Sequence, residues 1–174
     1  MSRSRSGAHH MPAGAAVQEV ADQLWDHETD VDVLAQIEET GTAALPVLRD
    51  LAQRVPGIDG AMVCTADGYN LCALGLEEAQ VGRLAAMTSS LYSVSGAACS
   101  AVAAQSRSGH AEPLEQVTLR SGDTQYMVFP IEHDELGYLL LSLWAKNVTL
   151  GELLMEAKIS AREIERIVHV DMGH

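Results

Sequence analysis

Side chains capable of acid–base chemistry occur in this sequence mainly as neighbouring carboxylates. Glu77-Glu78 and Asp134-Glu135 are the clearest pairs. Each pair lies at the end of an expected element, and the first suits a helix N-terminus because the helix dipole favours negative charge there. A catalytic pair would require a shared pocket that holds the two carboxyl groups at different pKa values. We therefore interpret both pairs as solvated surface groups.

Nucleophiles and metal ligands are also present, but not at catalytic spacing. Ser93-Val94-Ser95-Gly96 lies inside an expected helix and lacks the GxSxG pattern of a nucleophile elbow. The sequence contains no HExxH, CxxC, GxGxxG or GxxxxGK[ST] motif. Cys64, Cys72 and Cys99 have no histidine at metal-ligand spacing, so we expect all three to be buried thiols. The sequence predicts no cofactor, no metal site and no enzymatic activity.

Two arginines, Arg83 and Arg107, flank the longest expected helix. An arginine finger can raise a phosphoryl-transfer rate by about 10³–10⁵-fold where one exists. The local sequence does not distinguish these two residues from ordinary surface arginines. We therefore treat both as candidate partner contacts and assign no catalytic residue.

The element that would carry a binding surface is the proline-free stretch Glu77–Ala104. Apolar residues recur in it at three- and four-residue steps, which predicts one long helix with an apolar face toward a core. The residues of this face are Val81, Leu84, Met87, Leu91, Val94, Ala98 and Val102.

The opposite side of this helix is small, and no charge follows Arg83. Small side chains let another backbone approach closely, so we expect this side to be a protein contact surface, most simply with a second copy of the chain. The alternative is a helix buried within one domain. The expected contact residues are Ala85, Ala86, Ser89, Ser93, Gly96, Ala97, Ser100 and Ala104.

A β-hairpin is expected directly before this helix. Gly60–Thr65 and Tyr69–Leu74 are apolar runs separated by Asp67-Gly68, which is among the strongest hairpin signals because a type I′ turn needs positive φ at both central residues. With a two-residue loop, Cys64 and Cys72 would point to opposite faces of the sheet. We therefore expect no disulfide between them.

Three further strands are expected after the helix, at Glu115–Arg120, Gln125–Ile131 and Leu136–Ala145. A Gly122-Asp123 turn of type II′ would join the first two. The nearly continuous apolar run of the last strand predicts a central position with both faces covered. The first strand is more polar, which suits a sheet edge able to pair with another chain through the strand that carries Val117 and Leu119.

Two more helices complete the pattern. Leu45–Ala52 fits a helix with Pro46 in or just before its first turns. The last helix begins with a capping box, Thr149-x-x-Glu152, and runs through Ile167. The order helix, two strands, helix, three strands, helix predicts an α+β fold, in which helices sandwich a five-stranded, mainly antiparallel sheet.

The chain is expected to hold one domain with extensions. We expect a disordered tail at 1–16, an acidic and partly helical extension at 17–41, a compact domain at 42–168 and a frayed end at 169–174. Residues 1–39 contain eight acidic residues and two arginines, which suits either a solvated arm or a docking arm for a basic partner.

The net charge of −13 argues against a nucleic-acid partner and against an anionic membrane surface. The longest apolar run, Leu136–Ala145, is about half of the roughly 20 residues that a membrane span needs. No apolar segment of signal-peptide type follows Arg3 and Arg5. Together with an odd number of cysteines, this predicts a cytoplasmic protein without membrane insertion.

The order and local sequence of these elements resemble a known family. Val55-Pro56-Gly57-Ile58-Asp59-Gly60-Ala61, followed by a strand, Asp67-Gly68 and a second strand, is similar to the opening of roadblock (dynein-light-chain-like) domains. The long small-residue helix and Gly137-Tyr138-Leu139-Leu140-Leu141-Ser142-Leu143 fit the same pattern. The resemblance covers residues 42–168 and rests on order and spacing together, since no single motif is diagnostic.

This resemblance implies a profilin-like roadblock fold and a homodimer in which the long helices pack together and the third strands join two sheets. It also implies a small Ras-like GTPase as partner, with the chain acting as activating protein or effector and supplying no catalytic residue. One alternative is a dimeric scaffold in a sensor-kinase complex, without effect on GTP turnover. Another is a PAS-like ligand sensor, which would need a cavity with convergent polar groups.

Overall fold

The computed structural model describes residues 27–105 and 112–170. The chain divides into two compact units, Met1–Ala35 and Gln36–His174. Of the first unit, residues 27–35 are described and are helical. The expected tail at 1–16 and the residues at 171–174 lie outside the described part.

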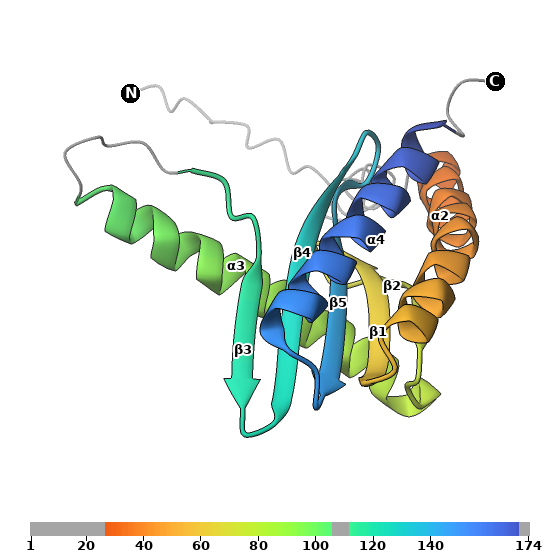
Figure 1. Cartoon of the computed structure of the whole chain (residues 1–174). Helices are drawn as coiled ribbons and strands as arrows, with labels where there is room; N and C mark the ends of the chain where they lie inside the picture. The colour runs from red at the N-terminus through yellow and green to blue at the C-terminus, as the bar shows by residue number, and fades with distance from the viewer. Residues whose placement is uncertain (1–26, 106–111, 171–174) are drawn as a thin grey trace, which may run out of the picture. The chain divides into compact units, whose positions relative to one another are not determined.

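The sequence-based expectation of an α+β fold is confirmed. The elements are α2 (His27–Arg54), β1 (Ile58–Thr65), β2 (Asn70–Leu74), α3 (Glu78–Ala103), β3 (Val117–Ser121), β4 (Thr124–His133), β5 (Gly137–Lys146) and α4 (Leu150–Val170). The five strands form one antiparallel sheet in the order β2-β1-β5-β4-β3. In the Gln36–His174 unit, α3 lies on one face of this sheet, whereas α4 and the second half of α2 lie on the other (Figure 1).

The positions of β5 and β3 in the sheet also agree with the sequence. β5 pairs with both β1 and β4, and five consecutive residues, 139–143, are buried. Because both of its faces are covered, every position tolerates an apolar side chain, which explains the continuous apolar run. β3 pairs with β4 alone and forms an edge of the sheet.

Alternating side chains of the strands build two apolar layers. The layer between the sheet and α2 and α4 contains Met127, Phe129 and Ile131 of β4, and the layer under α3 contains Val128. Cys72 lies in the first layer and Cys64 in the second, so the expectation that they point to opposite faces is confirmed. Burial raises the pKa of Cys64 to about 12 and that of Cys72 to about 11.

The expected position of Pro46 is wrong, because α2 is one helix in which this proline is internal. Proline cannot donate to the carbonyl of the residue four positions earlier, which is a local cost. Pro46 is on the exposed side, while Val47, Leu48 and Leu51 are buried against the sheet. Packing of this face stabilises the helix through the proline, since tertiary contacts provide most of the stability of helices in proteins.

Two of the hairpin turns, β1–β2 and β3–β4, differ in how well the sequence predicts them. Gly122-Asp123 forms the expected two-residue connection between Ser121 and Thr124, with a φ of +63° at Gly122. The β1–β2 connection is longer than the expected Asp67-Gly68 pair, because the strands are joined by residues 66–69 and their register shifts after Val63. Gly68 has a φ of +95°, the conformation for which glycine is suited.

Candidate protein-interaction surface

The first half of α3 packs on the sheet through small and hydroxyl-bearing residues. Ala85 and Thr88 are fully buried. The Thr88 hydroxyl donates to the backbone carbonyl of Leu84 at 2.8 Å and lies 2.6 Å from the Tyr126 hydroxyl of β4. Ser89 donates to the carbonyl of Ala66 in the β1–β2 turn. These contacts hold the helix at a fixed position on the sheet and orient its remaining sides.

Most of the small residues expected at a contact surface do face outward. Ala86, Ser93, Ala97, Ser100 and Ala104 are exposed. Ser89 and Gly96 are half-buried, and a Cβ added at Gly96 would meet no atom within 4 Å.

Ala85 does not belong to the outward-facing group, and the expectation that it does is wrong. Its side chain is fully buried in the layer under α3, together with Met62 and Leu140. It therefore packs within its own chain and has no surface left for a partner.

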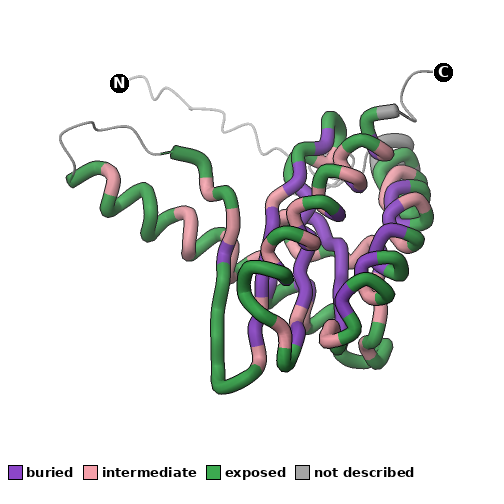
Figure 2. The backbone as a smooth tube through the Cα atoms, in the orientation of Figure 1, coloured by how far each residue is buried: buried purple, intermediate pink, exposed green. Residues whose placement is uncertain are grey.

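The apolar side of α3 is only partly covered, contrary to expectation. Val81, Leu84 and Leu91 are half-buried, as a core-facing side requires. Ala98 is exposed, and the further exposed members of this side are Met87 at 55%, Val94 at 67% and Val102 at 71% exposure. The two buried residues of α3 lie in its first half, and the second half runs out beyond β3, where no strand lies beneath it (Figures 1 and 2).

Two apolar grooves lie along α3. A groove of about 600 Å³ separates the helix from the β3–β4 hairpin and is lined by Leu84, Met87, Leu91, Leu119, Arg120, Ser121, Thr124 and Tyr126. A second groove of about 550 Å³ lies beside the last turns of the helix and is lined by Ala98, Cys99, Val102, Ala103, Glu112, Pro113, Leu114 and Glu115. Cys99 is exposed, so the expectation of a buried thiol at this position is wrong.

The edge of β3 continues this apolar surface. Leu119 lines the first groove and is 49% exposed. Val117 lies two residues earlier on the same face and is buried in the layer under α3, so its side chain is not part of the exposed surface. Within the described chain, no strand pairs with the outer edge of β3, which leaves its backbone groups open to another strand.

Charge is absent from the helix side of this region, whereas Arg120 lines the first groove and Glu112 and Glu115 line the second. Between Leu84 and Ala104 the sequence has no ionisable residue apart from Tyr92 and Cys99. Arg83 is exposed at the start of α3 and makes no ion pair within the part of the chain that the structure describes. Arg107 lies outside the described residues. We define the outward side of α3, the two grooves and the β3 edge as the α3–β3 surface.

The rest of the described chain offers little chemistry. Residues 27–105 and 112–170 contain no group of three histidine, cysteine or acidic side chains that could hold a metal ion. In the same ranges, no helix is long and apolar enough to cross a membrane. The α3–β3 surface is therefore the strongest candidate for a functional site.

Sequence reasoning missed the exposed apolar side of α3 and both grooves. The helix is apolar or small on every side, so its periodicity could not decide which side the sheet would cover. A helix of 26 residues is about 39 Å long, which is far more than the width of the few strands it crosses. The length of the helix was therefore the signal in the sequence that could have indicated an uncovered part of α3.

Comparison with known protein families agrees with the resemblance to roadblock domains. A family model described as Roadblock/LC7 domain matches residues 47–136. None of the curated protein sequences compared with this chain matches it.

Solved structures share the fold at low sequence identity. A Roadblock/LC7 domain from Streptomyces avermitilis is 22% identical, with a TM-score of 0.57 over 69% of this chain and 92% of that chain. An MglB structure described with a tetrameric arrangement is 17% identical, with a TM-score of 0.60 over 75% of this chain and 90% of the other. The gliding protein MglB from Thermus thermophilus is 16% identical, with a TM-score of 0.60 over 75% of this chain and 91% of that chain.

Proposed function

Because this chain belongs to the roadblock/LC7 domain family, we propose that it is a homodimeric regulator that binds a small Ras-like GTPase in the cytoplasm. The observation that carries this proposal is the α3–β3 surface. An uncharged, apolar helix side next to an open strand edge is typical of a protein interface.

The dimer would use both parts of this surface. Pairing of two β3 edges would satisfy backbone groups that are otherwise left to water, and two α3 helices with small outward residues could approach closely. The apolar side chains of Met87, Val94 and Val102 would then leave solvent. A stable interface buries about 1,200–2,000 Å² in total, and the length of α3 makes an area of this order accessible.

The GTPase partner in this proposal is supported by membership of the family and not by a nucleotide site in this chain. We propose that the dimer acts by holding the GTPase's own residues in place, through positioning and electrostatic preorganisation, and is not itself an enzyme. Arg83 is the candidate contact at the start of α3, since it is exposed and without an ion pair among the described residues.

A capture experiment tests the proposal. The purified full chain is used as bait for lysate of the native cell, once with GDP and once with a non-hydrolysable GTP analogue, and bound proteins are identified by mass spectrometry. Retention of a small GTPase in one nucleotide state is the expected result, and a turnover assay then separates activator from effector.

Two bait variants sharpen this experiment. Gly96→Glu places a charge on the α3–β3 surface, and Met155→Glu places one on exposed α4 as a matched control. We expect the first variant to lose the GTPase and the second to retain it. If no GTPase binds in either nucleotide state, the regulator proposal fails, and a scaffold function takes its place.

A further inference from the structure

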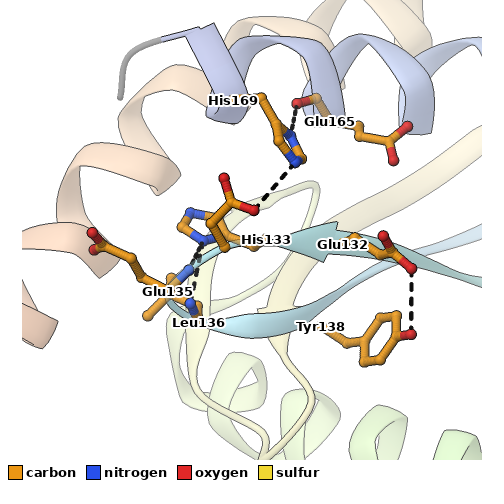
Figure 3. A network of polar contacts seen from close by, with 8 residues as sticks. Glu132, His133, Glu135, Leu136, Tyr138, Glu165 and His169 are labelled. Carbon is orange, nitrogen blue, oxygen red and sulfur yellow. Dashed lines mark hydrogen bonds and ion pairs between the residues drawn. The ribbon is translucent and has the colours of Figure 1, made fainter. Parts of the chain in front are cut away.

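A buried histidine lies at the β4–β5 turn, away from the α3–β3 surface. His133 is the last residue of β4 and is 5% exposed. Its Nδ1 atom accepts hydrogen bonds from the backbone N–H groups of Glu135 and Leu136, each at 3.2 Å (Figure 3). Its Nε2 atom lies 3.3 Å from the hydroxyl of Thr40 in α2. The ring thus joins the turn to a helix 93 residues away in sequence.

These contacts define the protonation state of the ring. An Nδ1 atom that accepts two N–H groups carries no proton, so the proton of the neutral imidazole is on Nε2, which can donate to Thr40. A cationic imidazole has a proton on both nitrogens. Protonation of Nδ1 would therefore place one N–H group against two others and break both hydrogen bonds of the turn.

Burial and the titratable groups of the β4–β5 turn and α4 shift the pKa of His133 in opposite directions. Burial lowers the pKa of His133 and is the largest cause; Glu135 and Asp134 of the turn raise it, and His169 of α4 lowers it. The Nε2 atom of His169 lies 3.8 Å from the Asp134 carboxylate. Its Nδ1 atom contacts the backbone carbonyl of Glu165 at 2.7 Å (Figure 3). From α2, the group that meets the ring is the uncharged hydroxyl of Thr40.

We propose that His133 is a pH-responsive clamp, which holds the β4–β5 turn closed and tied to α2 when neutral and releases it when protonated. The hydrogen-bond geometry carries this proposal, because every polar atom of the ring has a partner only in the neutral form.

The direction of the pH effect follows from proton linkage. The folded state binds the proton more weakly than the unfolded chain, since the pKa in the folded state is lowered. The stabilisation by the clamp is therefore fully present above the unfolded pKa of about 6.5 and is lost as the pH falls through the folded pKa. As the pH falls from about 6.5 to the pKa of the folded state, the population of molecules with the β4–β5 turn open rises by up to about tenfold per pH unit.

Hydrogen exchange of the full chain measures the opening directly. We compare the protection factors of the Glu135 and Leu136 amides with that of Met127, in the middle of β4, between pH 7.5 and 5.0. The expected result is that the first two fall below pH 6.5 by up to about tenfold per unit, whereas the Met127 value changes less.

Two variants test whether the pH-dependent fall in amide protection arises from His133 and not from His169. His133→Asn retains a side-chain acceptor for the turn amides, as in an Asx-turn, but cannot titrate, so its protection factors should not depend on pH. His169→Gln removes the neighbouring histidine and should keep the pH-dependent fall. A wild-type protein without this fall, or a fall of equal size in His133→Asn, would overturn the proposal.

A second measurement does not depend on a variant that folds. In an NMR titration of the wild-type protein, the Glu135 and Leu136 amide shifts should move with the same midpoint as the His133 ring. Amide shifts that titrate with another group, or that do not move, would contradict the clamp.

Discussion

The two faces of the sheet are covered to different extents. On the α2 and α4 side, apolar residues from two helices and four strands form one continuous buried layer. Arg54 of α2 links this helix to α4 by two hydrogen bonds. Its Nε donates to the Glu156 carboxylate at 2.7 Å, and its Nη2 donates to the Ser160 hydroxyl at 3.0 Å. On the α3 side, the buried layer is smaller, and one helix covers it only with its first half (Figure 2).

This difference suits the two faces to different roles. The closed face supplies the burial that stabilises the fold, because buried apolar area is the main favourable contribution to folding. The open face keeps large apolar side chains such as Val94 and Val102 in solvent, which is the usual mark of a surface that binds another protein.

The largest difference between the faces is expected in a pair of leucine substitutions. Leu141→Ala removes a fully buried side chain from the closed face and should lower the free energy of unfolding by about 2–5 kcal/mol. Leu119→Ala on the open face should cost under about 1 kcal/mol in a monomer, where this side chain is half exposed, and more in the proposed dimer, whose β3 strands would cover it. Denaturant unfolding at one protein concentration measures both. A Leu119→Ala loss equal to that of Leu141→Ala would show that β3 is buried in an assembled protein.

Charges placed on α3 test whether the open face is the dimer interface. Ser93→Arg or Gly96→Glu should shift the molecular mass from dimer to monomer, since an unpaired charge in an interface costs roughly 3 kcal/mol or more, about a hundredfold in Kd. Ser93 is exposed and Gly96 has open space around it, so neither variant should disturb the fold. Light scattering gives the mass and circular dichroism the fold, with Met155→Glu as the control. Dimers of both α3 variants would exclude this face as the interface.

Labelling of the cysteines with a thiol reagent compares buried and exposed positions in one experiment. At pH 8, exposed Cys99 should react with a thiol reagent, whereas Cys64 and Cys72 should react only after unfolding. Burial raises the pKa of Cys72 from 9.0 to about 11, which reduces its thiolate fraction about a hundredfold in addition to blocking access. The number of thiols labelled over time gives the result, and two fast thiols in the native protein would contradict it. Slower labelling of Cys99 at higher protein concentration would support an interface beside the second groove.

The smallest expected effect concerns the start of α4 on the closed face. The Thr149 hydroxyl accepts a hydrogen bond from the Glu152 N–H at 3.2 Å, which is the expected N-cap. Thr149→Ala should lower the free energy of unfolding by about 1 kcal/mol. Thr42→Ala on the exposed side of α2, outside the α3–β3 surface, is the control and should have only a small effect. Equal stability of the two variants in thermal or denaturant unfolding would show that the cap does not contribute.

The sequence predicted those parts of the fold that depend on local signals. The Thr149 cap, the Gly122-Asp123 turn and the alternation of Met127, Val128 and Phe129 were all readable, because capping, turn geometry and strand periodicity act over a few residues. The continuous apolar run of β5 likewise indicated a strand inside the sheet.

The errors share a different cause. Pro46 is a local signal against a helix interior, yet α2 continues through it because its neighbours pack on the sheet. Ala85 and Met87 lie two residues apart, and the sequence placed each on the wrong side of α3. Periodicity orients a helix only when one side is polar, and α3 has no such side.

The sequence by itself determined the order of elements, the antiparallel sheet and the family, since these follow from local preferences and their spacing. The tertiary structure alone decided how far the sheet extends beneath α3, and hence which apolar side chains stay in solvent. It also decided that His133 meets Thr40 and the two turn amides, which no spacing in the sequence indicates. Burial and long-range contact depend on what lies opposite each residue in space, and that is a property of the assembled sheet and helices.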